Sequence, residues 1–223
     1  MTAPNAAPQP LVSRIGRFLA IHEESFAGAG ISSNVYVTEH DGRYYVFDAS
    51  GSPDLLSYLE AAGISRGYIA GAILTHGHYD HVTGLRSLAG LDLPVFISKS
   101  DVKLMESTVG KVGAKGFESP AGASVLESLS LTSISTPGHT PGSTCFYSER
   151  EGLLISGDTV FPGGYFGRTD LPGGSDAEML ASLERLSKLG VSMMLPGHDM
   201  PLLEGASESI RSSLEYARSL LRP

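Results

Sequence analysis

The stretch Thr75-His76-Gly77-His78-Tyr79-Asp80-His81 places three histidines and one aspartate within six residues. An apolar run at residues 69–74 precedes it and indicates a buried strand, and residues 82–88 indicate the start of a helix. The stretch is therefore expected to form a loop between a strand and a helix. Imidazole and carboxylate groups rarely gather at this density without a ligand role, so the loop predicts a metal site.

The spacing within this loop indicates which side chains act together. Residues two apart in an extended loop point the same way, so His76 and His78 can bind one metal ion as a pair. Asp80 and His81 lie at the turn into the predicted helix and can face a second ion. Because imidazole and carboxylate suit zinc, iron and manganese better than calcium or magnesium, the loop predicts a transition-metal site.

Composition excludes several classes of protein. The chain has 223 residues, of which 41% are hydrophobic and 18% are charged, enough for a sizeable core. Its net charge of −8 argues against a general nucleic-acid binder, because phosphate binding needs clustered Lys and Arg. No apolar run is long enough to span a bilayer. We therefore expect neither nucleic acid nor a membrane as a partner.

The N-terminus and the cysteine content predict domain organisation and location. Residues 1–10 have no basic start and no apolar run, so we expect a flexible arm rather than a signal peptide, followed by a single domain at residues 11–223. The single cysteine, Cys145, excludes an intramolecular disulfide and is consistent with a reducing, cytoplasmic location. Cys145 lies on a predicted strand in an apolar setting, which disfavours the thiolate that a nucleophile needs.

Short strands are expected in both halves of the chain. Asp41-Gly42 predicts a hairpin between strands at residues 31–39 and 43–49. Asp48, near the end of the return strand, is interpreted as a turn or cap carboxylate in preference to a direct ligand. Further strands are expected at residues 11–21, 94–98, 130–135, 143–148, 153–156 and 191–195.

Helices alternate with these strands, which indicates a layered α/β domain. Ser52 as N-cap, Pro53 at the first helical position and Gly63 as a stop predict a helix over residues 53–62. Residues 106–123 lack periodicity and predict either a mobile flap beside the site or a plain linker. Other helices are expected at residues 100–107, 176–189 and 207–221. An apolar stripe marks the second of these as a core helix: Met179, Leu180, Leu183, Leu186 and Leu189.

Three more candidate ligands follow predicted strands in turns that contain Gly or Pro. They are His139 in residues 136–142, Asp158 in residues 156–159 and His198 in residues 195–199. Rigid Pro-Gly turns can hold a side chain at a strand end, where α/β sheets place their sites. Five of the seven histidines fall in these motifs, and the other two, His22 and His40, are interpreted as ordinary surface or core histidines.

Together these motifs resemble those of the metallo-β-lactamase superfamily, from about residue 11 to the C-terminal helix. The resemblance implies an α/β fold, a four-layer αββα sandwich with two divalent transition-metal ions at one edge of the sheets. It implies that His76, His78 and His139 bind one ion, that Asp80, His81 and His198 bind the other, and that Asp158 bridges both.

Differences between the subgroups of this superfamily reduce the number of activities expected for this chain. True β-lactamases of this fold lack a bridging aspartate, and acyl-homoserine lactonases carry a tyrosine where this chain has Phe161. Residues 156–161 followed by Gly167-Arg168-Thr169-Asp170 are similar to glyoxalase II and to persulfide dioxygenases. The helical domain that binds glutathione in two-domain glyoxalase II is missing, so the chain looks like the short, single-domain type of hydroxyacylglutathione hydrolase.

The resemblance implies a hydrolase of small-molecule thioesters such as S-lactoylglutathione. Zinc, iron or manganese ions would activate a bridging hydroxide, with Asp80 and Asp158 as the catalytic carboxylates. A thiolate leaving group needs little acid assistance, because thiols are more acidic than alcohols or amines. The alternatives are a persulfide dioxygenase with one iron on His76, His139 and Asp158, a lactonase or other small-ester hydrolase, and a non-catalytic metal-bearing scaffold.

Two further pairs are assigned supporting roles. Arg168 and Asp170 bring charge near Asp158, so we expect one of their side chains to orient a ligand or the metal loop. Lys111 and Lys115, in the region at residues 106–123, are the candidates to contact an anionic thiol carrier.

Overall fold

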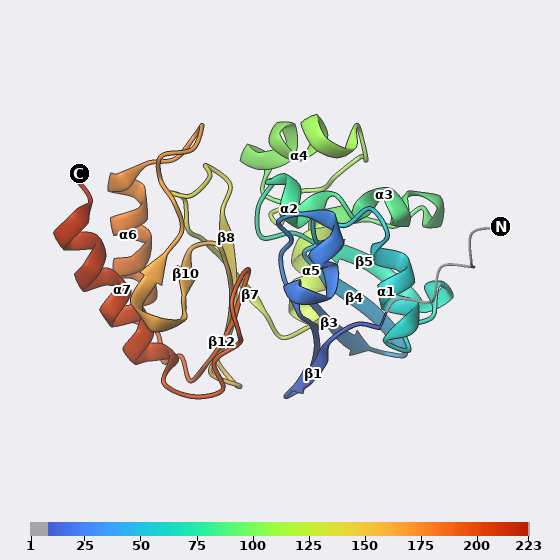
Figure 1. The fold of residues 1–223 in the computed structure, drawn as a ribbon, viewed down its shortest axis with the longest axis horizontal. Helices are drawn as coiled ribbons and strands as arrows, with labels where there is room; N and C mark the ends of the chain where they lie inside the picture. The colour runs from blue at the N-terminus through green and yellow to red at the C-terminus, as the bar shows by residue number, and fades with distance from the viewer. Residues whose placement is uncertain (1–8, 223) are drawn as a thin grey trace.

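Two β-sheets face each other and carry helices on their outer sides (Figure 1). The computed structural model describes residues 9–222, so the arm predicted at residues 1–10 lies almost wholly outside the described residues. The order of helices, sheet, sheet and helices is that of the predicted four-layer αββα sandwich, and the α/β class is confirmed.

The first sheet has six strands, which lie side by side in chain order. They are β1 (Val12–Ile15), β2 (Phe18–Ile21), β3 (Val35–His40), β4 (Arg43–Phe47), β5 (Ile69–Ile73) and β6 (Val95–Phe96). The strands from β1 to β4 pair antiparallel, whereas β5 is parallel to both β4 and β6. Parallel strands bring their C-terminal ends, and the loops that follow them, to the same edge of a sheet.

The second sheet comes from the C-terminal half. Its four strands lie in the order β12 (Met193–Pro196), β9 (Leu153–Gly157), β8 (Thr144–Ser148) and β7 (Thr132–Ser135). β12 is parallel to β9, so the loops after these two strands also share an edge. A separate ribbon pairs β10 (Val160–Phe161) with β11 (Tyr165–Phe166).

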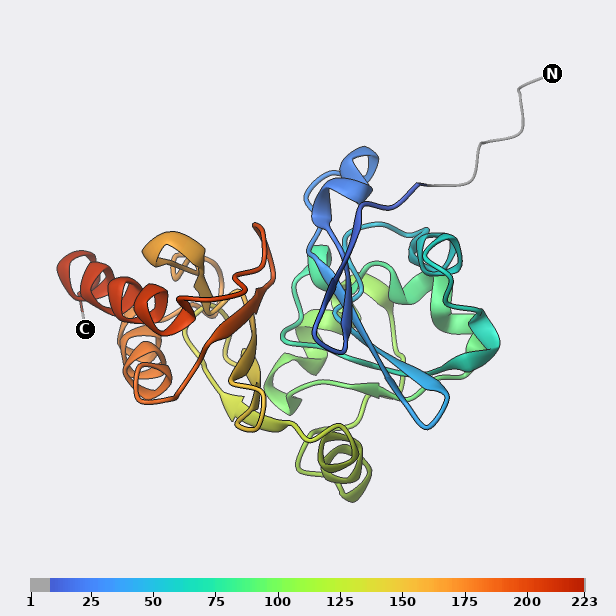
Figure 2. The same cartoon turned by 90° about the horizontal axis from the view of Figure 1, so that it is seen from below.

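Helices cover both outer faces, α6 and α7 on the second sheet and most of the others on the first (Figure 2). The α-helices are α1 (Leu55–Ala61), α2 (Tyr79–Val82), α3 (Leu85–Leu88), α4 (Val102–Val109), α5 (Pro120–Ser128), α6 (Asp176–Leu186) and α7 (Ala206–Leu220). The 3₁₀ segments are η1 (Glu23–Ala29), η2 (Arg66–Tyr68), η3 (Ala89–Leu91), η4 (Lys99–Asp101) and η5 (Pro162–Gly164). Within residues 9–222, no helix combines the length and apolar character needed to cross a membrane.

Alternation along the strands sorts the core into layers. In β3, Val37 joins the cluster that packs under α1, while Tyr36 joins the cluster between the two sheets. In β8, Cys145 joins the cluster under α6 and α7, while Phe146 points to the first sheet. Phe146 meets Phe47 of β4 edge-on, with 5.4 Å between ring centroids. Each sheet thus buries both faces, which fixes the two sheets against each other.

The apolar stripe predicted for residues 176–189 is confirmed as core. Ser175 Oγ accepts a hydrogen bond from Glu178 N at 3.3 Å and caps α6. Met179, Leu183 and Leu186 are fully buried against α7 and the second sheet. This spacing of four and three residues is what an amphipathic helix requires.

The structure corrects one predicted strand and confirms one predicted hairpin. Residues 11–21 form a hairpin of β1 and β2 rather than a single strand, because Gly16 adopts φ +55° and reverses the chain. The hairpin predicted at Asp41-Gly42 is present, with both residues at positive φ.

The structure also corrects two other predicted segments. The helix predicted from Pro53 begins at Leu55, and Ser52 Oγ accepts from Asp54 N at 3.2 Å in the turn ahead of it instead of capping it. The predicted flap or linker at residues 106–123 contains the end of α4 and the start of α5. Between them, Lys115 N donates to Val95 O at 2.8 Å, so the chain runs along β6 at the edge of the first sheet.

Candidate metal centre

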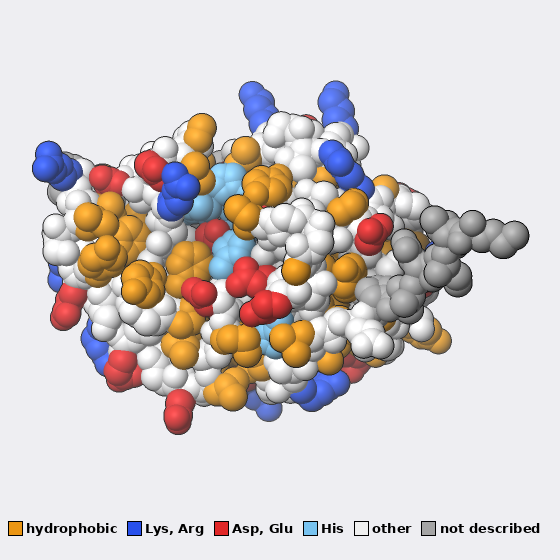
Figure 3. All heavy atoms as spheres, in the orientation of Figure 1, with side chains coloured by type: hydrophobic (Ala, Val, Ile, Leu, Met, Phe, Trp, Pro, Cys, Tyr) orange, Lys and Arg blue, Asp and Glu red, His pale blue; other side chains and the backbone are white. Residues whose placement is uncertain are grey.

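Loops from both sheets meet at one edge and bring together seven side chains in two groups. The first group is His76, His78 and His139, and the second is Asp80, His81, Asp158 and His198. Within each group the potential ligand atoms all lie within 4.8 Å of one another. Figure 3 shows histidine side chains in a hollow of the surface, with acidic and hydrophobic side chains around it. The structure thus brings together all seven residues predicted as metal ligands.

Two glycines allow the loops to approach so closely. A Cβ atom at Gly77 would lie 2.9 Å from Asp101 O and from Met105 N, at the start of α4. A Cβ atom at Gly197 would collide with the carboxylate of Asp158. Glycine is therefore required at both positions by space, quite apart from backbone freedom.

The three histidines of the first group point nitrogen atoms at one another. His78 Nδ1 lies 3.1 Å from His76 Nε2 and 2.9 Å from His139 Nε2. His139 Nδ1 donates to the carbonyl oxygen of Arg168 at 2.8 Å, which leaves the Nε2 lone pair facing inward. Thr75 Oγ1 gives its proton to Asp48 Oδ2, so at 3.1 Å it accepts from His76 Nδ1 and fixes the same tautomer there. Burial lowers the pKa of His76 well below its usual value and also lowers that of His78, which keeps both rings neutral.

In the second group, carboxylates lie behind the histidines. His81 Nδ1 donates to Asp48 Oδ2 at 2.8 Å, and His198 Nδ1 donates to Glu23 Oε2 at 2.7 Å. Both Nε2 atoms therefore face inward, where His198 Nε2 lies 3.3 Å from Asp80 Oδ2. A carboxylate behind the opposite ring nitrogen is the usual way in which metal-binding histidines are oriented.

Asp158 lies between the two groups. Its Oδ1 is 3.2 Å from His81 Nε2, and its Oδ2 is 3.5 Å from both His139 Nε2 and His198 Nε2. His139 belongs to the first group and the other two histidines to the second. One carboxylate is therefore within reach of ions held by either group.

Unpaired buried atoms show that this arrangement fits a metal. His81 Nε2 and Asp158 Oδ1 are both buried and have no hydrogen-bond partner among the described residues, although they face each other at 3.2 Å. Without a second proton on His81, these two inward lone pairs cannot bond to each other, and leaving them unpaired costs about 1–3 kcal/mol each. A divalent cation between such atoms removes this cost, so the donor set fits a transition-metal ion.

The negative charge of the second group favours the binding of protons or cations there. Burial alone would raise the pKa of Asp158, but the charge of His81 and a hydrogen bond from His198 hold that pKa well below its usual range. Burial would lower the pKa of His81, yet the charges of Asp158 and Asp48 raise it to about 10. Hydrogen bonds to the surrounding carboxylates, Asp158 first, likewise outweigh burial and raise the pKa of His198 to about 12. The charge that protons supply here can be supplied by a metal ion instead.

The sequence and the fold of this chain are similar to those of known proteins. The model of the metallo-beta-lactamase superfamily matches residues 28–198, well over half of the chain. This chain belongs to the metallo-beta-lactamase superfamily. It is 32% identical over 184 residues to the probable metallo-hydrolase YqgX of Bacillus subtilis, which covers 75% of this chain and 85% of the relative.

Other members of the superfamily extend the comparison. The chain is 31% identical over 168 residues to a hydroxyacylglutathione hydrolase of Bartonella quintana, covering 74% of this chain and 63% of that enzyme. The fold is similar to that of TTHA1623, solved in a di-iron-bound form, with a TM-score of 0.67 and 24% identity over 96% of this chain and 98% of that one. The chain is thus a member of a superfamily of metallo-hydrolases and carries two groups of His and Asp side chains with the spacing of metal ligands.

A buried carboxylate that sequence reasoning missed joins the two loops of the first group. Asp101 Oδ2 accepts from Gly77 N at 2.9 Å and from Thr140 Oγ1 at 2.7 Å, and its Oδ1 accepts from Gly142 N at 2.8 Å. Asp101 is fully buried at the start of α4. It therefore holds the loop of His76 and the loop of His139 in one arrangement.

Two more carboxylates lie behind histidines of the second group. Asp48 is in neither group of potential ligands, which agrees with the preference against a direct ligand, but it does more than close a turn: it is buried behind His81 and also accepts from Thr75 N at 2.8 Å. Asp48 directly follows β4 and has a φ of +57°, a backbone conformation that is strained for an aspartate and is found more often at functional sites. Glu23 lies 175 residues from His198 in the sequence, and no local signal distinguishes it from Glu24.

Arg168 supports the site through its main chain. The contact that orients His139 comes from the carbonyl oxygen of Arg168. The side chains of Arg168 and Asp170 instead pair with each other at 2.8 Å, and each is 68% exposed. This differs from the expectation that one of these side chains orients a ligand or the metal loop.

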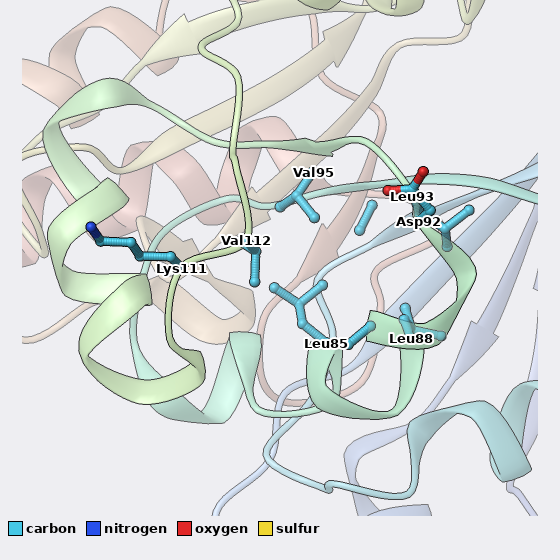
Figure 4. Close-up of a pocket in the computed structure, with 9 residues that line it drawn as sticks. Leu85, Leu88, Asp92, Leu93, Val95, Lys111 and Val112 are labelled. Carbon is cyan, nitrogen blue, oxygen red and sulfur yellow. The ribbon is translucent and has the colours of Figure 1, made fainter.

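The two predicted substrate-binding lysines lie in the segment between α4 and α5. Lys111 lines an apolar cavity of about 150 Å³ between α3 and this segment, and Figure 4 shows its side chain extending away from Leu85 and Val95. Lys115 is exposed beside β6. The role of both lysines in binding substrate stays a prediction.

Cys145 behaves as predicted. It is fully buried on β8, and burial raises the pKa of its thiol to about 11 despite hydrogen bonds from Thr136 and Thr159 that act in the opposite sense. A thiol in this state is a poor nucleophile.

Proposed function

We propose that this chain is a binuclear metallohydrolase of small acyl thioesters, of the glyoxalase II type. The observation that carries the proposal is the position of Asp158, whose two oxygens face histidines of both groups. The hydroxyacylglutathione hydrolase of Bartonella quintana, at 31% identity, supports thioesters as the substrate class. The proposed substrate is a small molecule of the cytoplasm, in keeping with the net charge of −8 and the single buried Cys145.

Each group has a proposed part in holding metal. His76, His78 and His139 would hold one ion, and Asp80, His81 and His198 would hold the other, with Asp158 shared between them. Two divalent ions, zinc, iron or manganese, would supply Lewis-acid stabilisation of the carbonyl oxygen and a water of lowered pKa. The inward tautomers of four histidines, fixed from behind, prepare the ligands for this task.

The side chains then account for the remaining steps of thioester cleavage. Asp80 has one oxygen facing His198 Nε2 and is positioned to orient the attacking water and accept its proton. Phe161, whose ring centroid lies 6.2 Å from that of His198, presents no hydroxyl to the substrate. A thiolate leaves without a general acid, since thiols are already acidic. No further acid residue is needed for this substrate class.

Metal content and substrate turnover together test the proposal. The apo protein is reloaded with zinc or with iron, analysed for metal per chain, and assayed with S-lactoylglutathione, a lactone and glutathione persulfide under oxygen. Two ions per chain and hydrolysis of the thioester are expected. One tightly bound iron, with oxygen consumed on the persulfide and no thioester turnover, would instead establish a persulfide dioxygenase.

A further inference from the structure

A segment of the N-terminal half touches the last ligand of the metal centre. Figure 2 shows η1 and the loop after β12 facing each other. Glu23, the first residue of η1, uses both carboxylate oxygens there: Oε2 accepts from His198 Nδ1 at 2.7 Å and Oε1 accepts from Asp199 N at 2.8 Å. The glutamate thus accepts hydrogen bonds from the His198 side chain and from the next peptide group of the same loop.

Asn34, which directly precedes β3, makes the other hydrogen bonds of this contact. Its Oδ1 accepts from Glu23 N at 2.9 Å, and its Nδ2 donates to Pro196 O at 3.1 Å and to Asp199 O at 2.8 Å. Asn34 N also donates to Gly197 O at 2.7 Å, and the residue is 1% exposed. The loop that carries His198 is therefore held on both sides of the histidine by two residues of the N-terminal half, Glu23 and Asn34.

The backbone after His198 needs this support. Asp199 has φ +67°, in the left-handed region that is unfavourable for a residue other than glycine. Its N–H is held by Glu23 and its carbonyl by Asn34. The two contacts offset this cost and fix the direction in which the His198 side chain leaves the chain.

We propose that Glu23 is a positioning residue that sets the affinity of the second group for its metal ion, through His198 and with Asn34 as its anchor. A carboxylate on Nδ1–H keeps the lone pair of His198 on Nε2 and makes that nitrogen a stronger ligand. The inference rests on the proposed function for the identity of the ligands. It adds a residue, 175 positions away in the chain, on which the second ion depends and the first does not.

Zinc binding to the full-length apo protein tests this role. Wild type, Glu23→Gln and Glu24→Gln are titrated with zinc against a chromophoric chelator, and thermal melting checks that each is folded. Glu24 is the matched control, since it is the exposed next residue. In Glu23→Gln the second dissociation constant should rise about 10–100-fold while the first stays unchanged. Equal second constants in wild type and Glu23→Gln would overturn the inference.

A measurement without metal separates this inference from the proposed function. If wild type binds a single zinc ion, the binuclear proposal fails, and the hydrogen bond on His198 Nδ1 decides about Glu23. In the ¹H NMR spectrum of the apo protein, the Nδ1 proton of His198 should resonate far downfield in wild type and in Glu24→Gln, and should lose that position in Glu23→Ala. An unchanged Nδ1 proton resonance in Glu23→Ala would show that Glu23 does not position His198.

Discussion

The two groups of potential ligands, which form the two halves of the candidate metal centre, differ in the charge of their side chains and of the groups that orient them. The first group is three histidines, and the groups behind two of them are neutral: the hydroxyl of Thr75 and the carbonyl of Arg168. The second group mixes carboxylates with imidazoles and has two more carboxylates behind it, Asp48 and Glu23. The first therefore presents neutral nitrogen ligands, and the second concentrates negative charge that must be balanced by a cation.

The difference also concerns how each half is held. His139 is oriented by a main-chain carbonyl, which no side-chain substitution removes. His81 and His198 are oriented by side chains that come from β4 and η1. The second half is consequently the one that mutation can weaken selectively, whereas a change at the shared Asp158 should affect both.

The largest effect is expected for Asp158→Ala, which removes the carboxylate shared by the two halves. Turnover of S-lactoylglutathione should fall by about 10³-fold, the scale of losing a central electrostatic group. The fold should persist, because Asp158 Oδ1 is unpaired in the folded protein. Steady-state kinetics and circular dichroism measure the two quantities. A variant with near-normal kcat would rule out the shared role of Asp158.

A smaller effect, largest in the second half, is expected for Asp48→Ala. The substitution leaves the buried Thr75 N and His81 Nδ1 without an acceptor and removes the acceptor of the Thr75 hydroxyl proton, so the free energy of unfolding should drop by about 3–5 kcal/mol. Because Thr75 Oγ1 also contacts His76 Nδ1, the first half should be weakened to a smaller extent. Metal content should fall toward one ion per chain. Asp54→Ala, at an exposed carboxylate that makes no capping bond, is the control and should leave unfolding in denaturant almost unchanged. Retention of two ions at wild-type affinity in Asp48→Ala would mean that the carboxylate behind His81 is dispensable.

The smallest effect is expected for Asp170→Asn, behind the first half. The exposed pair of Arg168 and Asp170 is weakened, but the carbonyl contact to His139 remains. The value of kcat/KM should change less than about threefold, because exposed ion pairs contribute little. A drop of an order of magnitude in kcat/KM or in zinc affinity would show that the side chains, and not the main chain, orient this half.

Some elements of the fold were predictable from local sequence patterns, and others were not. The apolar spacing of Met179, Leu183 and Leu186 predicted α6, and Asp41-Gly42 predicted a hairpin, because these signals are contained in a few neighbouring residues. The hairpin at residues 11–21 was missed because Gly16 is a weak turn signal without a polar partner. The start of α1 at Leu55 and the regular structure within residues 106–123 depend on packing against neighbouring elements, which local pattern does not contain.

The sequence by itself determined the candidate ligands, and the tertiary structure decided which groups orient them. Histidines and aspartates in glycine-bearing turns at strand ends are recognisable when the motifs are taken together, because a metal requires several such donors and close loops require glycine. Asp48, Asp101 and Glu23 are not distinguished by the residues next to them in the sequence and acquire their roles through partners 24 to 175 residues away. A hydrogen bond to a ligand depends on where two distant segments meet, and only packing of the two sheets brings those segments together.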